Sequence, residues 1–341
     1  MMTSALDFYL PETLNATHPP EKRGIRRDQV RLMVLNKTTG EIKHDRFHHL
    51  MNYLQPGDLI VLNNSRTIPA VLHGKWVRNN IQLSPKIEVR LAKRRTDDTW
   101  EALIVASPVK KGDTLLFSSE LSACVCDEKK NSPLKTIQFS KKGTELFNLI
   151  YALGEPVRYE YIQHPWELDS YQTVFASHPG SVEMPSAGRA FSWELIFKLK
   201  EKGIGIDFIQ LHTGLSYLLD DWKTSPEENE EEYHIPTTTM NKIAETKKSG
   251  NKVIAVGTTV VRAIESAAKN NALTGVTNLY IQNQYPLKMV DGILTGFHEP
   301  KASHLDMLSS FISEDHLMNA YSQAIKNGYL WHEFGDMNLI L

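Results

Sequence analysis

The sequence predicts an α/β domain that is interrupted by a smaller all-β, barrel-like domain. Three observations support this fold class: short apolar strands alternate with amphipathic helices in both outer parts of the chain, helical periodicity is absent between about residues 68 and 142, and it returns directly afterwards. The expected division is an α/β domain of residues 1–67 and 143–341 with an inserted β-barrel domain of residues 68–142.

The first part of the α/β domain is predicted to hold two strands and one helical segment. VRLMVLN at residues 30–36 is predicted as an alternating strand, and residues 44–54 carry apolar side chains at helical spacing. LIVLN at residues 59–63 is a short apolar run, which is typical of a buried strand. A polar cluster ends this strand: Asn63, Asn64, Ser65 and Arg66. Turn chemistry with a structural ion pair, or a binding site at the strand end, both account for such a cluster.

The inserted domain is predicted from short strands that recur at even intervals between polar turns. Such spacing is typical of a small barrel or sandwich. The six predicted strands are AVLHGKW, KIEVRLA, TWEALIV, DTLLF, LSACVC and LKTIQF.

The C-terminal part again alternates helices and strands. Residues 191–203 form an amphipathic helix with a glycine stop, and IDFIQLH follows as a strand that ends in His212. SPEENEEEYHI, residues 225–235, is predicted to be a solvated acidic loop, and residues 237–249 a helix. A further strand in MVDGILTG leads through a polar turn to another amphipathic helix.

The segment NKVIAVGTTVVRAIESAA, residues 251–268, predicts a buried strand, a tight turn at Gly257 and a helix. Thr258 and Thr259 are expected to cap that helix with their hydroxyls, leaving N–H groups for an anion or a ribose. The carboxyl end of a parallel strand is the usual place for a ligand crevice. A plain strand-to-helix turn explains the same residues, and a single Gly-Thr-Thr turn does not decide between the two.

Charge is distributed unevenly along the chain, although the net charge is only -2. Residues 1–142 hold 23 Lys and Arg against 15 Asp and Glu, whereas the rest hold 15 against 25. The N-terminal part is therefore the candidate for contact with a polyanion such as RNA. Clustered surface charge is also commonly just a solvated face, so both interpretations stay open.

Composition argues against membrane, secreted and metal-dependent classes. The N-terminus has no basic head followed by an apolar stretch, and no apolar run is long enough to span a bilayer, so a cytoplasmic location is expected. Cys124 and Cys126 are separated by one residue, which matches neither a CxxC pair nor a zinc spacing. No metal site is expected.

Several stretches together resemble one family. They are RRDQVRLMVLNKTTGEIKH, YLQPGDLIVLNNSRTIPAVL, YQTVFASHPGSVEMPSAG, VIAVGTTVVRAIES, FHEPKASHLDML and the tail FGDMNLIL. In these stretches the chain resembles the S-adenosylmethionine:tRNA ribosyltransferase-isomerases of queuosine biosynthesis. Each motif is modest alone, but jointly they cover nearly the whole chain in the family's order.

The resemblance implies an α/β domain with an inserted β-barrel and an unusual reaction. S-adenosylmethionine would be the co-substrate and would donate its ribosyl part to the aminomethyl group of a 7-deazaguanine in a tRNA anticodon, to give epoxyqueuosine. Such a reaction needs a base, a site for adenosine and a cationic surface for the anticodon arm, but no metal. A monomer is favoured, and the oligomeric state is left open.

The matched motifs supply the candidate site residues. His212, His298 and Asp28 are the candidates for catalysis, the two histidines because each follows a strand. A histidine at such a place also commonly has a structural role. The candidates for substrate binding are Arg27, Asn64, Ser65, Arg66, Gly257, Thr258, Thr259, Arg262, Glu265 and Lys301.

The chain departs from the family's usual pattern at several of these motifs. Asn64 stands where an acidic residue is usual, PSAGRAF replaces PTAGLHF through Arg189 and Ala190, and Ser216 and Glu299 also differ. An absent imidazole cannot move a proton, and a guanidinium brings a permanent charge. Two alternatives therefore stand beside the family's activity: a relative that binds S-adenosylmethionine or another nucleoside but uses a different acceptor, and a non-catalytic RNA-binding protein.

Overall fold

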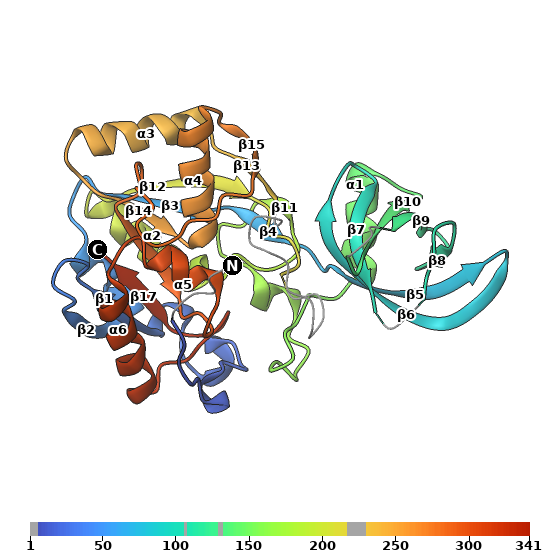
Figure 1. Cartoon of the computed structure of the whole chain (residues 1–341), viewed down its shortest axis with the longest axis horizontal. Coiled ribbons are helices and arrows are strands. Elements are labelled where there is room, and N and C mark those ends of the chain that lie inside the picture. Colours follow the sequence, from blue (N-terminus) through green and yellow to red (C-terminus); the bar gives the residue numbers. More distant parts are fainter. Residues whose placement is uncertain (1–5, 106–107, 129–131, 217–229) are drawn as a thin grey trace.

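The chain forms a large mixed sheet covered by helices and, to one side of it, a closed β-barrel (Figure 1). The computed structural model describes residues 6–105, 108–128, 132–216 and 230–341. The barrel and the helix-covered sheet confirm the predicted fold class, an α/β domain with an inserted all-β domain.

The mixed sheet has nine strands in the described part of the chain, in the order β15-β13-β12-β3-β14-β16-β17-β1-β2. Their bounds are β1 (Arg31–Leu35), β2 (Ile42–Arg46), β3 (Leu59–Asn63), β12 (Gly205–Leu211), β13 (Glu231–His234), β14 (Val253–Val256), β15 (Thr274–Thr277), β16 (Gly292–Gly296) and β17 (Met337–Ile340). The central strands β12, β3, β14 and β16 run parallel to one another. Strands β3 and β14 are wholly buried, because helices cover both faces of the sheet there.

Six strands begin or end along the same side of this sheet, the side reached by the carboxyl ends of its central parallel strands. We call that side the site edge. The carboxyl ends of β12, β3, β14 and β16 lie along it. Strand β17 runs antiparallel to β16 and parallel to β1, so β17 and β1 begin at the same edge. The segments before β1 and β17 therefore lie beside the segments after the four parallel strands.

Alternation along the strands divides the core into two layers. Val253 and Ala255 of β14 pack into a cluster with α4, whereas Ile254 and Val256 pack into a second cluster with α2 on the other face. The α-helices of this domain are α2 (Trp193–Glu201), α3 (Thr237–Lys248), α4 (Thr258–Asn270), α5 (Ser303–Leu308) and α6 (Glu314–Lys326). Short 3₁₀ helices are η1 (Glu12–Leu14), η2 (Pro20–Arg23), η3 (Arg27–Gln29), η4 (Phe47–Tyr53), η5 (Leu168–Tyr171) and η6 (Ser186–Gly188).

The barrel closes in the strand order β10-β7-β6-β5-β8-β9. All six segments predicted as strands are strands: β5 (Val71–Arg78), β6 (Ile81–Arg94), β7 (Thr99–Ile104), β8 (Thr114–Leu116), β9 (Ser122–Glu128) and β10 (Leu134–Phe139). The ribbon of β5 and β6 extends beyond the rest of the barrel (Figure 1).

Helix α1 (Gly143–Leu153) directly follows the barrel strands. Its buried residues Leu146 and Ile150 belong to the hydrophobic cluster of the barrel, together with Trp100 and Leu72. The division at residues 68 and 142 stays a prediction, and the packing of α1 favours a second boundary after Gly154.

Three local expectations differ from the structure. Residues 44–54 are not an α-helix, because β2 extends to Arg46 and only the tighter η4 follows. The predicted acidic loop is wrong over Glu231–His234, which form β13 with Glu231 and Tyr233 buried. The predicted threonine caps are also wrong, because Gly257 is the N-cap of α4 and no side chain caps it. Residues 225–229 of that acidic stretch lie outside the described residues.

Candidate functional site

The site edge brings together most of the predicted site residues. His212 directly follows β12, Asn64 follows β3, Gly257 follows β14, and His298 stands two residues beyond β16. Arg27 and Asp28 in η3 reach the same edge because β1 begins there. Sequence reasoning placed each residue at a strand end, and the parallel pairing collects them in one place.

A small pocket opens at this edge, where β1 and β17 begin. Its walls come from η2, η3, η6, the end of β16 and the segment before β17. The lining residues are Pro20, Arg27, Val30, Ser186, Arg189, Ala190, Gly296, His332, Glu333, Phe334, Gly335 and Met337. Polar, charged and apolar residues from distant parts of the sequence therefore meet at this small pocket.

The turn after β14 lies against η6, next to the pocket. Gly257 has φ 90° and ψ 154°, a conformation that only glycine adopts easily. A Cβ at Gly257 would lie 3.2 Å from the Cβ of Ala187, so this turn and η6 pack closely. Thr258 and Thr259 begin α4, whose first turn has no side-chain cap and keeps N–H donors for a ligand.

Ser65 and His212 form a buried polar network at the ends of β3 and β12. Parallel pairing of β4 (Ser65–Thr67) with β11 (His178–Ser181) brings Ser181 beside them. The Ser65 Oγ lies 2.7 Å from His212 Nδ1 and 2.6 Å from Ser181 Oγ. Gln210 Nε2 lies 2.7 Å from His212 Nε2, and burial lowers the pKa of His212 to about 4. The imidazole is therefore neutral at pH 7.

Asn64 lies beside this network. Its backbone N–H donates to the carbonyl of Ile209 in β12, and its carbonyl accepts from the N–H of Ser177, just before β11. Its buried side-chain oxygen Oδ1 accepts no hydrogen bond from the described residues. A buried acceptor of this kind suits a ligand donor.

The position of His298 is fixed by contacts of its ring and of its backbone carbonyl. Its Nε2 lies 3.0 Å from Thr295 Oγ1, its carbonyl accepts from Trp331, and its ring stacks on that of His304 at 4.6 Å between centroids. Burial lowers the pKa of His298 well below its ordinary value, so this ring is also neutral.

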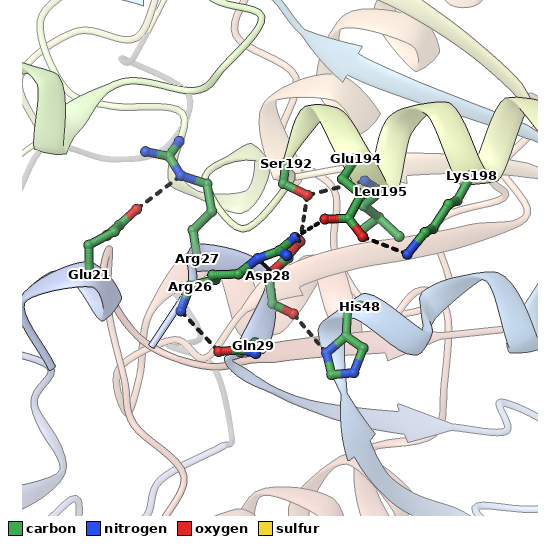
Figure 2. A network of polar contacts seen from close by, with 10 residues as sticks. All are labelled: Glu21, Arg26, Arg27, Asp28, Gln29, His48, Ser192, Glu194, Leu195 and Lys198. Atoms are coloured by element: carbon green, nitrogen blue, oxygen red, sulfur yellow. Dashed lines mark hydrogen bonds and ion pairs between the residues drawn. The ribbon is translucent and has the colours of Figure 1, made fainter. Parts of the chain in front are cut away.

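Asp28 is fully engaged by its neighbours, as Figure 2 shows. Its buried carboxylate accepts from the Arg26 guanidinium at 2.7 Å and from the hydroxyl of Ser192, the N-cap of α2. Arg27 points the other way in the same view, toward Glu21 at 3.0 Å. These contacts favour a structural role for Asp28 and a pocket role for Arg27.

Two further predicted binding residues lie in α4 and connect it to neighbouring segments of the protein. Arg262 pairs with Glu231 and donates to the carbonyls of Leu279 and Thr277. Glu265 is 1% exposed, and its carboxylate accepts three consecutive backbone N–H groups, those of Lys288, Met289 and Val290. Both contact protein groups rather than the pocket.

Arg66 and Lys301 lie at the surface. Arg66 is exposed and stands over the ring of Tyr151 at 5.8 Å. Lys301 is exposed, has φ 62° and pairs with Asp7 at 2.9 Å.

The departure at Arg189 adds a buried, paired guanidinium to the site. Arg189 is 3% exposed, donates to Glu21 at 2.9 Å and to the carbonyl of Ser170 at 2.7 Å, and lies over the Phe334 ring. Arg189 shares the single carboxylate of Glu21 with Arg27, so these three groups together leave one positive charge in the pocket wall, which Ala190 also lines.

The structure adds a group of residues that sequence reasoning missed, and we call it the acid–aromatic cluster. It comprises Tyr159, Tyr161, Glu183, Ser216, Glu299, His332 and Glu333. The rings of Tyr159 and Tyr161 stack at 5.7 Å, and Tyr161 stacks on His332 at 4.3 Å. Tyr159 donates to Glu183 at 2.8 Å, and Tyr161 donates to Glu333.

Two of the departures from the family pattern, Ser216 and Glu299, belong to this cluster. Ser216 donates through its backbone N–H to Glu183 at 2.7 Å, and Glu299 lies 3.7 Å from His332 Nδ1. The available sequence signal was the position of Glu333, four residues before β17 and next to the matched tail FGDMNLIL.

Ion pairs neutralise several of the basic residues that give residues 1–142 their positive charge. Arg90 pairs with Glu88, Arg94 with Asp97, Arg95 with Glu101 and Lys93 with Glu230. Lys110, Lys111 and Arg66 are exposed cations outside these ion pairs.

Neither a metal cluster nor a membrane span is found among the residues that the structure describes. No group of three His, Cys, Asp or Glu side chains there is placed to hold a metal ion. None of the helices in these ranges combines the length and hydropathy that crossing a bilayer requires.

Comparison with known proteins decides the family. A sequence model of the family described as queuosine biosynthesis protein matches residues 3–340. The chain belongs to the queuosine biosynthesis protein family. It is 39% identical over 350 residues to an S-adenosylmethionine:tRNA ribosyltransferase-isomerase of Halothermothrix orenii, with 100% of both chains covered. A relative of the same name from Thermotoga maritima is 36% identical over 348 residues, again with 100% of both covered.

A solved structure agrees with this assignment. The crystal structure of an S-adenosylmethionine tRNA ribosyltransferase from Thermotoga maritima is similar, with a TM-score of 0.57 and 32% sequence identity. The match covers 99% of this chain and 100% of that one. These findings confirm the family predicted from the sequence and, with it, the prediction of an enzyme.

Proposed function

We propose that this queuosine-family enzyme transfers and isomerises the ribosyl moiety of S-adenosylmethionine onto 7-aminomethyl-7-deazaguanine in tRNA, giving epoxyqueuosine. The observation that carries the proposal is the family match over residues 3–340, combined with a pocket at the sheet edge where the matched motifs meet. The reaction releases adenine and methionine.

S-adenosylmethionine is proposed to bind at the turn after β14. Uncapped N–H groups of Thr258 and Thr259 offer donors for ribose hydroxyls or a carboxylate, and Gly257 allows close approach. The unpartnered Asn64 Oδ1 supplies an acceptor on the neighbouring strand. His212 and Ser65 are assigned to holding the loop that carries Asn64, since both ring nitrogens of His212 face protein groups.

The anticodon arm of tRNA is proposed as the second partner. Its modified base must come to the site edge, because the acceptor amine has to reach the ribosyl carbons. The exposed cations Arg66, Lys110 and Lys111 lie on or near the barrel and suit the phosphate backbone. A cytoplasmic location and a monomer complete the proposal, and no metal is assigned a role.

The direct test is to incubate the complete protein with S-adenosylmethionine and tRNA that carries the aminomethyl-deazaguanine. The tRNA is then digested and its nucleosides are identified by mass, with the Thermotoga maritima relative run in parallel. Epoxyqueuosine in both reactions supports the proposal, and product from the relative alone overturns it.

A second candidate is an enzyme that uses S-adenosylmethionine with a different acceptor. Ser216 and Glu299 favour it, because both depart from the family pattern and both belong to the acid–aromatic cluster beside the pocket. Saturable binding of S-adenosylmethionine without epoxyqueuosine would support this candidate. A non-catalytic RNA binder would show no such binding.

A further inference from the structure

Glu333 is the acidic residue that lines the pocket. It precedes β17 and lines the pocket together with Arg27, Ser186 and Gly296. Among the described side chains, Tyr161 is the one that donates a hydrogen bond to its carboxylate. The position combines contact with a pocket and a fixed orientation, which a group that reacts with a ligand needs.

The surroundings of Glu333 are aromatic and acidic. The ring of Tyr161 stacks on those of Tyr159 and His332, so aromatic packing holds the residue whose hydroxyl donates to Glu333. Burial, together with the charges of Glu183 and Glu299, raises the pKa of Glu333 to about 7, although the Tyr161 hydrogen bond opposes this. His332 is neutral at pH 7, because burial lowers its pKa to about 4.

Among the described residues, no Lys, Arg or His forms an ion pair with Glu333. The cationic residues in the pocket wall are Arg27 and Arg189, and each is paired with Glu21. Tyr171 is 2% exposed, its ring is tilted against that of Phe334 at 5.3 Å between centroids, and its hydroxyl has no hydrogen-bond partner in the described residues. A half-buried carboxylate that lies beside aromatic rings and forms no ion pair with the described residues suits an organic cation.

We infer that Glu333 is a catalytic residue that accepts a proton from the ammonium form of the acceptor's aminomethyl group. The inference rests on the proposed function. One N–H bond of the ammonium breaks, its electron pair stays on nitrogen, and the proton forms an O–H bond with the carboxylate. The neutral amine can then attack the ribosyl carbon, whereas the ammonium has no electron pair to donate.

The chemistry of the two available protons favours the amine. An alkyl ammonium has a pKa of about 10, so transfer of its proton to a carboxylate with a pKa near 7 is unfavourable by a factor of about 10³ at equilibrium, and the attack that follows consumes the neutral amine. The C–H group beside a sulfonium is a far weaker acid and needs a stronger base. The carboxylate also pairs electrostatically with the ammonium before the transfer.

The first test is Glu333→Gln, which keeps the shape and removes the basic oxygen. We expect the single-turnover rate of product formation to fall roughly 10²–10⁴-fold, with binding of S-adenosylmethionine unchanged. Glu167→Gln is the matched control, because Glu167 is exposed on the segment that leads to η5. An active Glu333→Gln variant would overturn the inference. Loss of both activity and S-adenosylmethionine binding would also count against it, since it would indicate a structural role.

The second test uses Tyr161→Phe and does not depend on the first variant folding. This change removes the hydrogen bond that stabilises ionised Glu333, so the acidic limb of the pH–rate profile should move to higher pH. Tyr159→Phe is the control, because Tyr159 donates to Glu183 instead. If the acidic limb of the pH–rate profile lies at the same pH in Tyr161→Phe as in the unmodified protein, the inference is contradicted.

Failure of the inference is distinguishable from failure of the proposed function. If the unmodified protein forms epoxyqueuosine and Glu333→Gln does so equally fast, only the role of Glu333 is wrong. If the unmodified protein forms none while the Thermotoga maritima relative does, both are overturned.

Discussion

His212 and Ser65 are 147 positions apart in the sequence, yet His212 Nδ1 lies 2.7 Å from Ser65 Oγ. The contact joins the ends of β12 and β3 and fixes the loop that carries Asn64. Burial keeps this imidazole neutral, so it supplies no charge to the site. Because its pKa is lower in the folded protein than in the unfolded chain, the folding stability depends on pH.

The first prediction concerns that pH dependence. The pKa of His212 is lowered from 6.5 to about 4, so the unfolded chain binds a proton between these values while the folded chain does not. Stability is therefore lost as the pH falls through this window. The contribution of His212 amounts to about 2 kcal/mol between pH 7 and pH 5.

The measurement is urea denaturation of the unmodified protein and of His212→Gln at both pH values. The free-energy difference between the two proteins should shrink at pH 5, because the glutamine binds no proton. A difference that is the same at both values would contradict the assignment.

The second prediction concerns the turn after β14. Gly257→Ala forces a side chain into a conformation that favours glycine and places its Cβ 3.2 Å from Ala187. We expect a loss of about 1–3 kcal/mol of unfolding free energy, together with weaker S-adenosylmethionine binding in calorimetry.

Gly250→Ala is the control for this substitution. Gly250 has φ 75° and no atom near its missing Cβ, so it tests backbone strain alone. It should lose about 1–2 kcal/mol and bind S-adenosylmethionine normally. Equal binding by the two variants would remove Gly257 from the proposed site.

The third prediction concerns Glu265, which accepts three backbone N–H groups within the fold. Glu265→Gln replaces one acceptor oxygen by a donor, and we expect a loss of about 1–3 kcal/mol in urea denaturation. Glu245→Gln, on the exposed side of α3, should change little. A stable Glu265→Gln variant with lost S-adenosylmethionine binding would instead support the ligand role expected from the sequence.

The sequence predicts the parts of the fold that depend on local pattern. The apolar runs LIVLN and VIAV are wholly buried strands, and the even spacing of six short strands predicts the barrel. Local pattern also places His212, Asn64 and Gly257 at strand ends. The parallel pairing that brings these ends together is not local, but follows from the fold class.

The rest of the site depends on contacts between distant segments. Tyr161 and Glu333 are 172 positions apart, and nothing in either neighbourhood indicates that their side chains meet. The loop predicted at Glu231 is wrong, because an acidic run resembles a solvated loop in the sequence. In the structure Glu231 lies in a buried strand, where Arg262 of α4 neutralises its charge. The same limit applies to Arg189, whose partner Glu21 lies in the N-terminal arm.

The most direct measurement follows the ribosyl carbons themselves. The complete protein is incubated with S-adenosylmethionine labelled with ¹³C in its ribose and with tRNA that carries the aminomethyl-deazaguanine, and the digested tRNA is analysed by mass. We expect an epoxyqueuosine nucleoside that is heavier by the labelled ribosyl carbons, with adenine and methionine released in equal amounts. Adenine release without label in the tRNA, or unmodified tRNA beside an active relative, would contradict this expectation.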